Sequence, residues 1–181
     1  MDEVPERVII FASSKIKVKE VTKALKSMKL NVGEMHSDLE QGQREAVMHD
    51  FKAGRINILV ATDIVARGID IDDIRLVINF DVPHDSEDYV HRIGRTARAN
   101  NDGVALTFVS EKEQSNFKSI ENFLEKEIYK IPIPTELGEA PEYKPRSFSN
   151  KGGNYSKRRN FKGKRNNGGG KGNNRPSPRQ N

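Results

Sequence analysis

Short apolar runs alternate with amphipathic segments between residues 8 and 109 of the chain. The runs 8–12, 31–35, 56–62, 76–80 and 103–109 have the composition of β-strands, and several are apolar on both faces, as buried parallel strands are. Because helices connect parallel strands, this alternation predicts an α/β fold in three layers, with a mostly parallel sheet flanked by helices. Such folds hold their ligands beyond the carboxyl ends of the strands. The residues that follow each strand are therefore the first candidates for a site.

Three longer segments have the period of an amphipathic helix. One covers residues 15–28, and a second covers 43–54 and ends at Gly54, a residue type that commonly terminates helices. A third begins after Ser110, which has the spacing of a capping box with Glu113. The residues expected on the apolar faces of these helices are Val18, Val21, Leu25, Met28, Ala46, Val47, Phe51, Phe117, Ile120, Phe123 and Leu124.

The composition excludes several classes of protein. The 181 residues contain no cysteine, so neither disulfides nor thiolate metal sites are available, which fits a reducing cytoplasm. The first ten residues lack the basic start and the long apolar region of a secretory signal. The chain has no apolar run that approaches the roughly 20 residues of a membrane helix. We therefore expect a cytoplasmic chain that does not enter a membrane.

Charge is distributed unevenly along the chain. Residues 142–181 hold twelve of the 31 Lys and Arg residues and one of the 26 acidic residues, which leaves 19 basic and 25 acidic residues in the first 141. An acidic body with a basic tail indicates a polyanionic partner, and nucleic acid is the first candidate. The tail is too polar to fold alone, so we expect a folded domain at 1–135 and a disordered tail at 136–181. Its isolated aromatic residues are Tyr143, Phe148, Tyr155 and Phe161.

Polar residues follow the first two predicted strands. Ser13 and Ser14 stand at the start of a helix, where hydroxyl and backbone N–H groups can receive a phosphate, although a plain helix cap is the alternative. Gln41 and Arg44 share a helix face that could present an amide and a guanidinium group to a nucleic-acid backbone. The alternative for this second pair is an ordinary polar helix start capped by Asp38.

The segment after the third strand is denser in polar residues. Thr62 and Asp63 follow the buried run directly, and Arg67, Gly68 and Asp70 come within one short turn. The glycine permits a close backbone approach that a side chain would block, and successive N–H groups in such a turn can bind an anion. This concentration of Thr, Asp, Arg and Gly favours a functional loop over a structural one.

The segment YVHRIGRTAR, residues 89–98, places Arg92, Arg95 and Arg98 at a three-residue step. We expect a short helix over 86–92, with all three guanidinium groups projecting toward the edge of the sheet that holds Arg67. Guanidinium groups match phosphate oxygens in a two-point fork, and an arginine finger of this kind accelerates phosphoryl transfer by roughly 10³–10⁵. The expected anchors of this helix on the sheet are Val90 and Ile93. The alternative is a salt-bridged helix that uses Asp85, Glu87 and Asp88.

In these motifs the chain resembles the C-terminal RecA-like domain of DEAD-box ATP-dependent RNA helicases over about residues 4–135. VIIFASS is similar to motif IV, QGQR to the Gln-x-x-Arg element, ATDIVARGIDI to motif V and HRIGRTAR to motif VI. One position departs from the family pattern, because Ala97 stands where the family very often has glycine.

The resemblance implies a role for each matching residue. At the nucleotide, it implies that Arg95 and Arg98 reach the γ-phosphate as catalytic arginines and that Asp70 lies near the ribose or the interdomain water network. It implies that His91 and Arg92 link motif VI to a partner lobe. It also implies an RNA-backbone surface made of Ser13, Arg44, Thr62, Arg67 and Gly68 and supported by Gln41 and Asp63.

The printed chain contains neither a GxxxxGK[ST] phosphate loop nor an Asp-Glu-Ala-Asp box. We therefore expect ATP and Mg²⁺ to be held mainly by an N-terminal RecA-like lobe, and this chain alone to be inactive as an ATPase. RNA is the expected substrate, and the tail is expected to bind RNA non-specifically through phosphate attraction and base stacking. The alternatives are a stand-alone RNA-binding or annealing module and the second lobe of a DNA-directed helicase.

Overall fold

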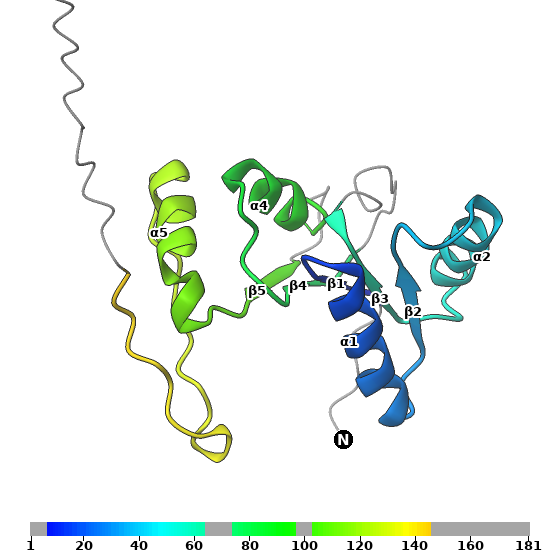
Figure 1. Cartoon of the computed structure of the whole chain (residues 1–181), viewed down its shortest axis with the longest axis horizontal. Coiled ribbons are helices and arrows are strands. Elements are labelled where there is room, and N and C mark those ends of the chain that lie inside the picture. The colour runs from blue at the N-terminus through cyan, green and yellow to red at the C-terminus, as the bar shows by residue number, and fades with distance from the viewer. Residues whose placement is uncertain (1–6, 64–73, 97–102, 146–181) are drawn as a thin grey trace, which may run out of the picture. The chain divides into compact units, whose positions relative to one another are not determined.

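A computed structural model describes residues 7–63, 74–96 and 103–145 of the chain. Its five strands form one parallel sheet in the order β2-β3-β1-β4-β5 (Figure 1). The strands are β1 (Val8–Phe11), β2 (Val32–Met35), β3 (Ile58–Ala61), β4 (Leu76–Asn79) and β5 (Val104–Thr107). Each lies inside a predicted run, so the five predicted strands are confirmed.

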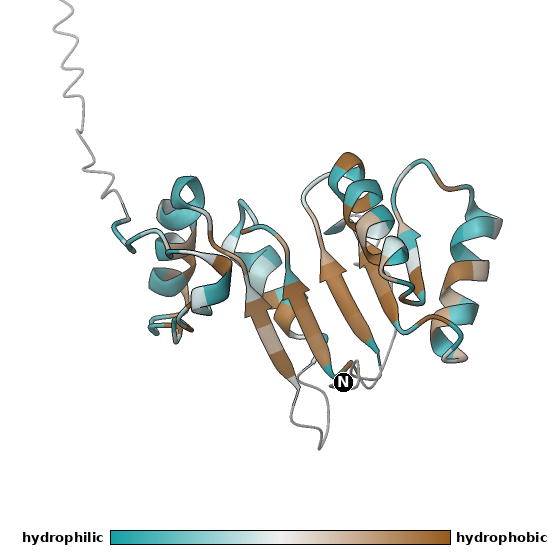
Figure 2. Ribbon diagram, turned by 90° about the horizontal axis from the view of Figure 1, so that it is seen from below, coloured by the Kyte–Doolittle hydropathy of each residue, from teal (hydrophilic) through white to brown (hydrophobic). Residues whose placement is uncertain are grey.

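Helices cover both faces of the sheet, which confirms the predicted three layers. Helix α1 (Lys15–Ser27) packs Val18 against alternate residues of β1 and β3, such as Ile10 and Val60. Helix α2 (Gln41–Lys52) packs Phe51 on the opposite face, with Ile9, Phe11 and Leu59 in the same cluster. Figure 2 shows the hydrophobic strands as brown arrows, and this apolar character on both faces is what two helical layers require.

The two long helices begin and end through local hydrogen bonds. Ser14 caps α1, because its Oγ accepts a hydrogen bond from the backbone N–H of Lys17 at 3.3 Å. Glu40 caps α2 and forms a capping box with Gln43, so the cap considered in the alternative, Asp38, does not serve as one. At the other end of α2, the predicted terminator Gly54 has a φ of 73°, a conformation that glycine adopts without strain.

A third cluster holds the last two helices together. Helix α4 (Ser86–Ile93) contributes Tyr89, and α5 (Gln114–Phe123) contributes Phe117 and Ile120. The predicted capping box of Ser110 and Glu113 is present at the 3₁₀ turn Glu111–Glu113 that precedes α5.

Three residues expected on apolar helix faces are exposed instead. Met28 is 67% exposed because it forms the C-cap of α1, beyond the packed turns. Ala46 lies outside the stripe of α2 that packs, which uses Val47, Met48 and Phe51. Phe123 is 54% exposed because α5 turns Phe117, Ile120 and Leu124 toward the third cluster.

Residues 142–144 dock on α5, although the charge pattern places them in the tail. The Gln114 amide donates to the Glu142 carbonyl at 2.8 Å and accepts from the Lys144 backbone N–H at 2.7 Å. Tyr143 packs edge-on against Phe117 and donates to Glu121 at 3.1 Å, so it is not an isolated aromatic residue. None of the helices in the described ranges is long and apolar enough to cross a membrane.

Candidate functional site

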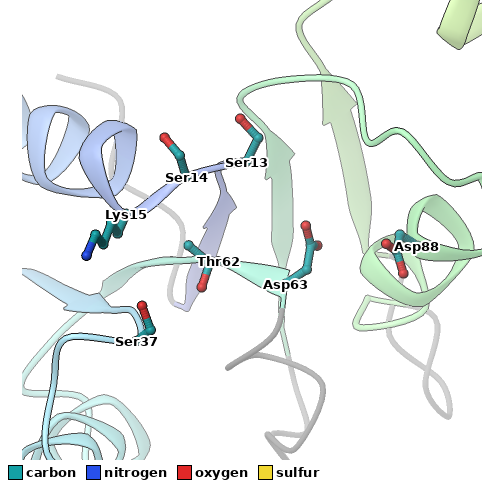
Figure 3. A pocket seen from close by; sticks show the side chains of 7 residues that line it. All are labelled: Ser13, Ser14, Lys15, Ser37, Thr62, Asp63 and Asp88. Atoms are coloured by element: carbon teal, nitrogen blue, oxygen red, sulfur yellow. The ribbon is translucent and has the colours of Figure 1, made fainter.

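A cavity of about 300 Å³ opens where three neighbouring strands end (Figure 3). Thr62 and Asp63 follow β3 in the centre, and Ser37 follows β2. The remaining lining residues come from the start of α1 and from α4, and they are Ser13, Ser14, Lys15 and Asp88. The sheet thus brings together Ser13, Thr62 and Asp63, which were predicted for one surface from separate strand ends.

The two serines at the end of β1 have different tasks. Ser14 uses its hydroxyl to cap α1, which is the plain alternative considered for this position. The backbone N–H of Ser13 donates to Asp81 Oδ2 at 2.9 Å, which fixes the strand end. The Ser13 hydroxyl is exposed on the cavity wall, where it can donate to a phosphate oxygen.

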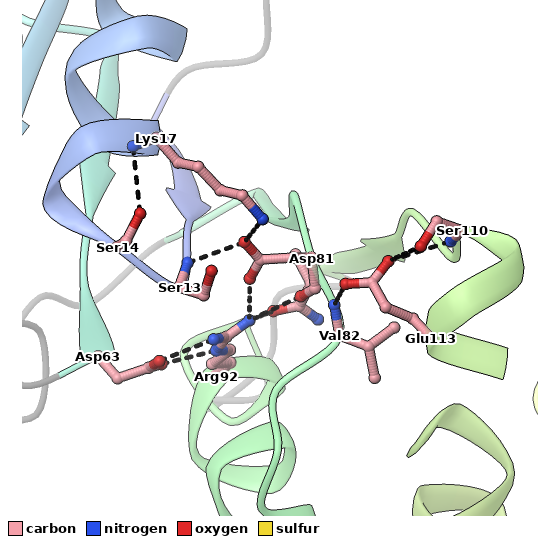
Figure 4. Close-up of polar contacts among 10 residues, drawn as sticks. Ser13, Ser14, Lys17, Asp63, Asp81, Val82, Arg92, Ser110 and Glu113 are labelled. Atoms are coloured by element: carbon pink, nitrogen blue, oxygen red, sulfur yellow. Dashed lines mark hydrogen bonds and ion pairs between the residues drawn. The ribbon is translucent and has the colours of Figure 1, made fainter. Parts of the chain in front are cut away.

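Arg92 is the centre of the polar network behind the cavity (Figure 4). Its Nε donates to Asp63 Oδ1 at 2.6 Å, and its Nη2 donates to Asp63 Oδ2 at 2.7 Å. Its Nη1 donates to the carbonyl of Asp81 at 3.0 Å and to Asn79 Oδ1 at 3.3 Å. The guanidinium group also lies over the Phe11 ring, 5.3 Å from the centroid. This two-point fork ties α4 to the end of β3.

The burial of Arg92 corrects the expectation that all three arginines of motif 89–98 project from the sheet. Its side chain is 2% exposed, because the buried residues of α4 are Tyr89 and Arg92 rather than Val90. Val90, expected as an anchor, is 37% exposed, whereas Ile93 packs at the edge of the third cluster. A guanidinium group occupies a core position here because its partners satisfy its charge and donors.

Asp81 belongs to the site, although it was not predicted. Its Oδ2 accepts from the Ser13 N–H at 2.9 Å and from Lys17 Nζ at 3.1 Å. Its Oδ1 is buried, accepts no hydrogen bond within the described ranges and faces Arg92 Nη1 at 3.9 Å. The sequence does contain a signal for it, because Asp81 follows the run 76–80 just as Asp63 follows the run 56–62.

The predicted pair on α2 is only partly brought to the cavity. Arg44 donates through Nη2 to the carbonyl of the lining residue Ser37 at 3.3 Å. Gln41 turns along the helix and donates to Glu45 at 2.8 Å.

Asp38, the other residue considered near α2, is held by lysines of α1. Lys15 and Lys19 bind its carboxylate at 2.7 and 3.0 Å. Their hydrogen bonds lower the pKa of Asp38 to about 2.

The arginine segment continues one turn beyond Arg92. Arg95 is half-buried, and its backbone N–H donates to the Arg92 carbonyl at 3.2 Å. His91 is exposed, with Nδ1 4.0 Å from Asp88 Oδ1. The predicted residues Arg67, Gly68, Asp70 and Arg98 lie outside the described residues.

The chemistry that this arrangement allows is recognition of phosphate. Serine and threonine hydroxyls and the ammonium group of Lys15 line a cavity at the carboxyl edge of a parallel sheet, where α/β folds bind ligands. The carboxylates of Asp63 and Asp88 line it as well, and Asp63 is paired with Arg92. Within residues 7–63, 74–96 and 103–145, no group of three or more His, Asp or Glu side chains could hold a metal ion.

Comparison with known proteins gives consistent matches. Residues 1–100 match the family described as helicase conserved C-terminal domain. The DEAD-box ATP-dependent RNA helicase CshA of Bacillus cereus is 42% identical over 147 residues, which are 81% of this chain and 28% of that protein. The chain spans less than a third of the length of the curated relatives that it matches first.

Solved structures share the fold. The DEAD-box protein SrmB of E. coli, bound to regulator of ribonuclease activity A, superimposes with a TM-score of 0.68 and 36% identity, over 78% of this chain and 81% of that chain. Dbp5 of S. cerevisiae, bound to RNA and ADP BeF3, superimposes with a TM-score of 0.61 and 33% identity, over 65% of this chain and 32% of that chain.

Proposed function

Because the chain belongs to the helicase C-terminal domains of DEAD-box ATP-dependent RNA helicases, we propose that it supplies arginine fingers and an RNA-backbone surface to local duplex unwinding. In this proposal an N-terminal RecA-like lobe of the same protein holds ATP. RNA and nucleotide together close the two lobes, and one RNA strand is bent so that a short duplex separates.

The observation that carries the proposal is the fork between Arg92 and Asp63. It joins the helix that leads to Arg95 to the strand end that lines the cavity, with contacts of 2.6 and 2.7 Å. An RNA strand at Thr62 and a phosphoryl group at Arg95 would therefore act on one rigid unit. Such a unit can couple the binding of RNA to the position of Arg95 at the nucleotide when the lobes close.

We assign the residues as follows. Arg95 and Arg98 stabilise charge on the transferring phosphoryl group, because guanidinium groups remain charged and bind phosphate oxygens in pairs. Asp70 contributes to the nucleotide side, and His91 to the contact with the other lobe. Arg92 supports that contact from its buried position. The RNA-backbone surface consists of Ser13, Gln41, Arg44, Thr62, Asp63, Arg67 and Gly68.

ATP with Mg²⁺ supplies the phosphoryl group and neutralises part of its charge when bound. In this proposal the N-terminal lobe holds most of the contacts to ATP and Mg²⁺. The role of this chain is to add positive charge and to exclude water at the closed cleft. The Ser13 and Thr62 hydroxyls bind sugar or phosphate, which positions the RNA without reading its sequence.

The test compares this chain alone with a two-lobed protein in which an N-terminal RecA-like lobe precedes it. We expect no ATPase activity from the chain alone, and activity that rises with added RNA, more than with DNA of the same sequence, in the two-lobed protein. Robust turnover by the chain alone would refute this division of labour. Equal stimulation by DNA would favour a DNA-directed helicase.

The basic tail supports a second candidate, a stand-alone RNA-binding or annealing module. Residues 142–181 carry twelve basic residues and one acid, with aromatic residues between them, which suits sequence-tolerant binding. Deletion of 146–181 separates the candidates. The annealing module loses its function, whereas the helicase domain still closes onto the N-terminal lobe in the presence of RNA and a nucleotide.

A further inference from the structure

Helix α1 concentrates the positive charge of an otherwise acidic body. Residues 15–29 contain six lysines and a single acid, Glu20, whereas the first 141 residues contain more acidic than basic residues. The charge is therefore not a general property of this surface. It belongs to one helix.

Four of these lysines form a row that begins at the cavity. Lys15, Lys19, Lys23 and Lys26 lie within about 80° of one another around the helix axis and extend over about 16 Å. All four are exposed, and Lys15 is also a lining residue of the cavity. The row thus leads from the proposed RNA site along the length of α1.

The row costs α1 stability. The first turn of the helix has no acidic residue and contains Lys15, whose positive charge is unfavourable at that end of the helix dipole, whereas Lys26 in the last turn interacts favourably with the dipole. Lysines spaced three or four residues apart also repel one another, by a few tenths of a kcal/mol per pair.

Only the first half of the row has a carboxylate partner. Asp38 binds Lys15 and Lys19, but Lys23 and Lys26 have no ion-pair partner among the described residues. A local cost without compensation in the fold is typical of functional surfaces. A ligand with several negative charges would remove the repulsion between the lysines.

We infer that the lysine row Lys15, Lys19, Lys23 and Lys26 binds the backbone of the RNA segment that flanks the cavity. The inference rests on the proposed function, because RNA at the cavity brings the flanking phosphates to the start of the row. Lysine acts at phosphate as a point charge with rotatable donors, so the contact is independent of base sequence. The row would add affinity and fix the direction in which the strand leaves the site.

The test measures binding of a labelled polyuridine oligonucleotide to the full chain by fluorescence anisotropy over a series of salt concentrations. The variant is Lys23→Gln with Lys26→Gln, and the matched control is Lys112→Gln with Lys126→Gln, which removes the same charge from exposed positions outside α1. The plot of log affinity against log salt should become shallower by about 1.4 in the α1 variant, since each phosphate contact of a single strand contributes about 0.7. The control should keep the slope of the unchanged chain.

The outcomes are distinct for the two proposals. If the unchanged chain binds no RNA, this inference fails, whereas the proposed function is refuted separately, by a two-lobed protein whose ATPase activity does not respond to RNA. If the unchanged chain binds and both double variants give the same slope, the lysines of α1 form an ordinary solvated face and this inference alone is overturned. Equal urea unfolding curves for all three proteins confirm that the comparison concerns binding rather than folding.

Discussion

Arg92 and Asp63 are 29 residues apart in sequence, and they meet through two hydrogen bonds of 2.6 and 2.7 Å. The side chain of Arg92 is 2% exposed and that of Asp63 is 24% exposed, so the pair lies at the boundary between the core and the cavity. Its geometry fixes both the rotation of α4 and the position of the chain that leaves β3. The pair therefore sets the distance between the arginine segment and the residues that we propose for the RNA-backbone surface.

Arg92→Lys should lower the free energy of unfolding by roughly 2–3 kcal/mol, because a lysine keeps the charge but loses the fork to Asp63 and the contacts to Asn79 and Asp81. Urea unfolding measures the change. Arg55→Lys is the matched control, since Arg55 pairs with Asp50 on the surface. Exposed pairs of this kind contribute about 0–1 kcal/mol. If the two variants lowered the free energy of unfolding by similar amounts, the buried fork would stabilise the fold no more than an exposed ion pair does.

The buried carboxylate of Glu121 makes the free energy of unfolding depend on pH. Burial alone would raise its pKa, but hydrogen bonds from Lys130, the Ile128 backbone, Lys118 and Tyr143 lower the pKa from 4.5 to about 2. Because the pKa of Glu121 is lower in the folded chain than in the unfolded chain, the ionised carboxylate stabilises the fold at pH values above the unfolded-state pKa. This stability is lost as the pH falls from about 4.5 toward about 2.

Glu121→Gln should remove that part of the acid sensitivity. We expect the variant to be less stable than the unchanged chain at pH 7, with a smaller further loss between pH 4.5 and 2 in urea unfolding. Glu45→Gln alters an exposed carboxylate and is the control. The assignment to Glu121 would be wrong if its variant kept the full acid-induced loss of the unchanged chain.

Two glycines allow a matched test of packing. A Cβ atom at Gly33 in β2 would lie 2.9 Å from Ile56 Cδ1 and 3.1 Å from Val47 Cγ1, whereas one at Gly42 in α2 would have no atom within 4 Å. Gly33→Ala should destabilise the fold by roughly 1–3 kcal/mol through crowding. Gly42→Ala should stabilise it by roughly 0.5–1 kcal/mol, because alanine loses less entropy in a helix. Thermal unfolding that shifts in the same direction for both would contradict the packing between β2 and α2.

The elements of the fold could be predicted because they depend on local pattern. Apolar runs and capping residues such as Ser110 mark strands and helices within a few residues of sequence. The cavity could be predicted in part, since parallel strands end at one edge and bring Ser13 near Thr62 and Asp63. That step needs only the topology of the sheet.

The partners of individual charges could not be predicted in the same way. Arg92 resembles a surface residue and Val90 a core residue in sequence, and the structure reverses them because Asp63, Asn79 and Asp81 surround the buried guanidinium group. Those partners come from the ends of two different strands. Hydrophobic period alone contains no information about such distant compensation of charge.

The last prediction concerns Arg95, which follows the buried Arg92 by one helical turn. In a two-lobed protein, Arg95→Lys should lower the kcat of RNA-stimulated ATP hydrolysis by roughly 10³ or more, because lysine cannot provide the fork to a transferring phosphoryl group. RNA affinity should stay unchanged, since Arg95 is assigned to the nucleotide and not to the strand. Arg55 is an exposed residue that follows α2, and Arg55→Lys should leave both kcat and RNA affinity unchanged. A loss of RNA affinity with an unaltered kcat would instead move Arg95 to the RNA side, because a residue that acts only in the transition state affects turnover and not ground-state binding.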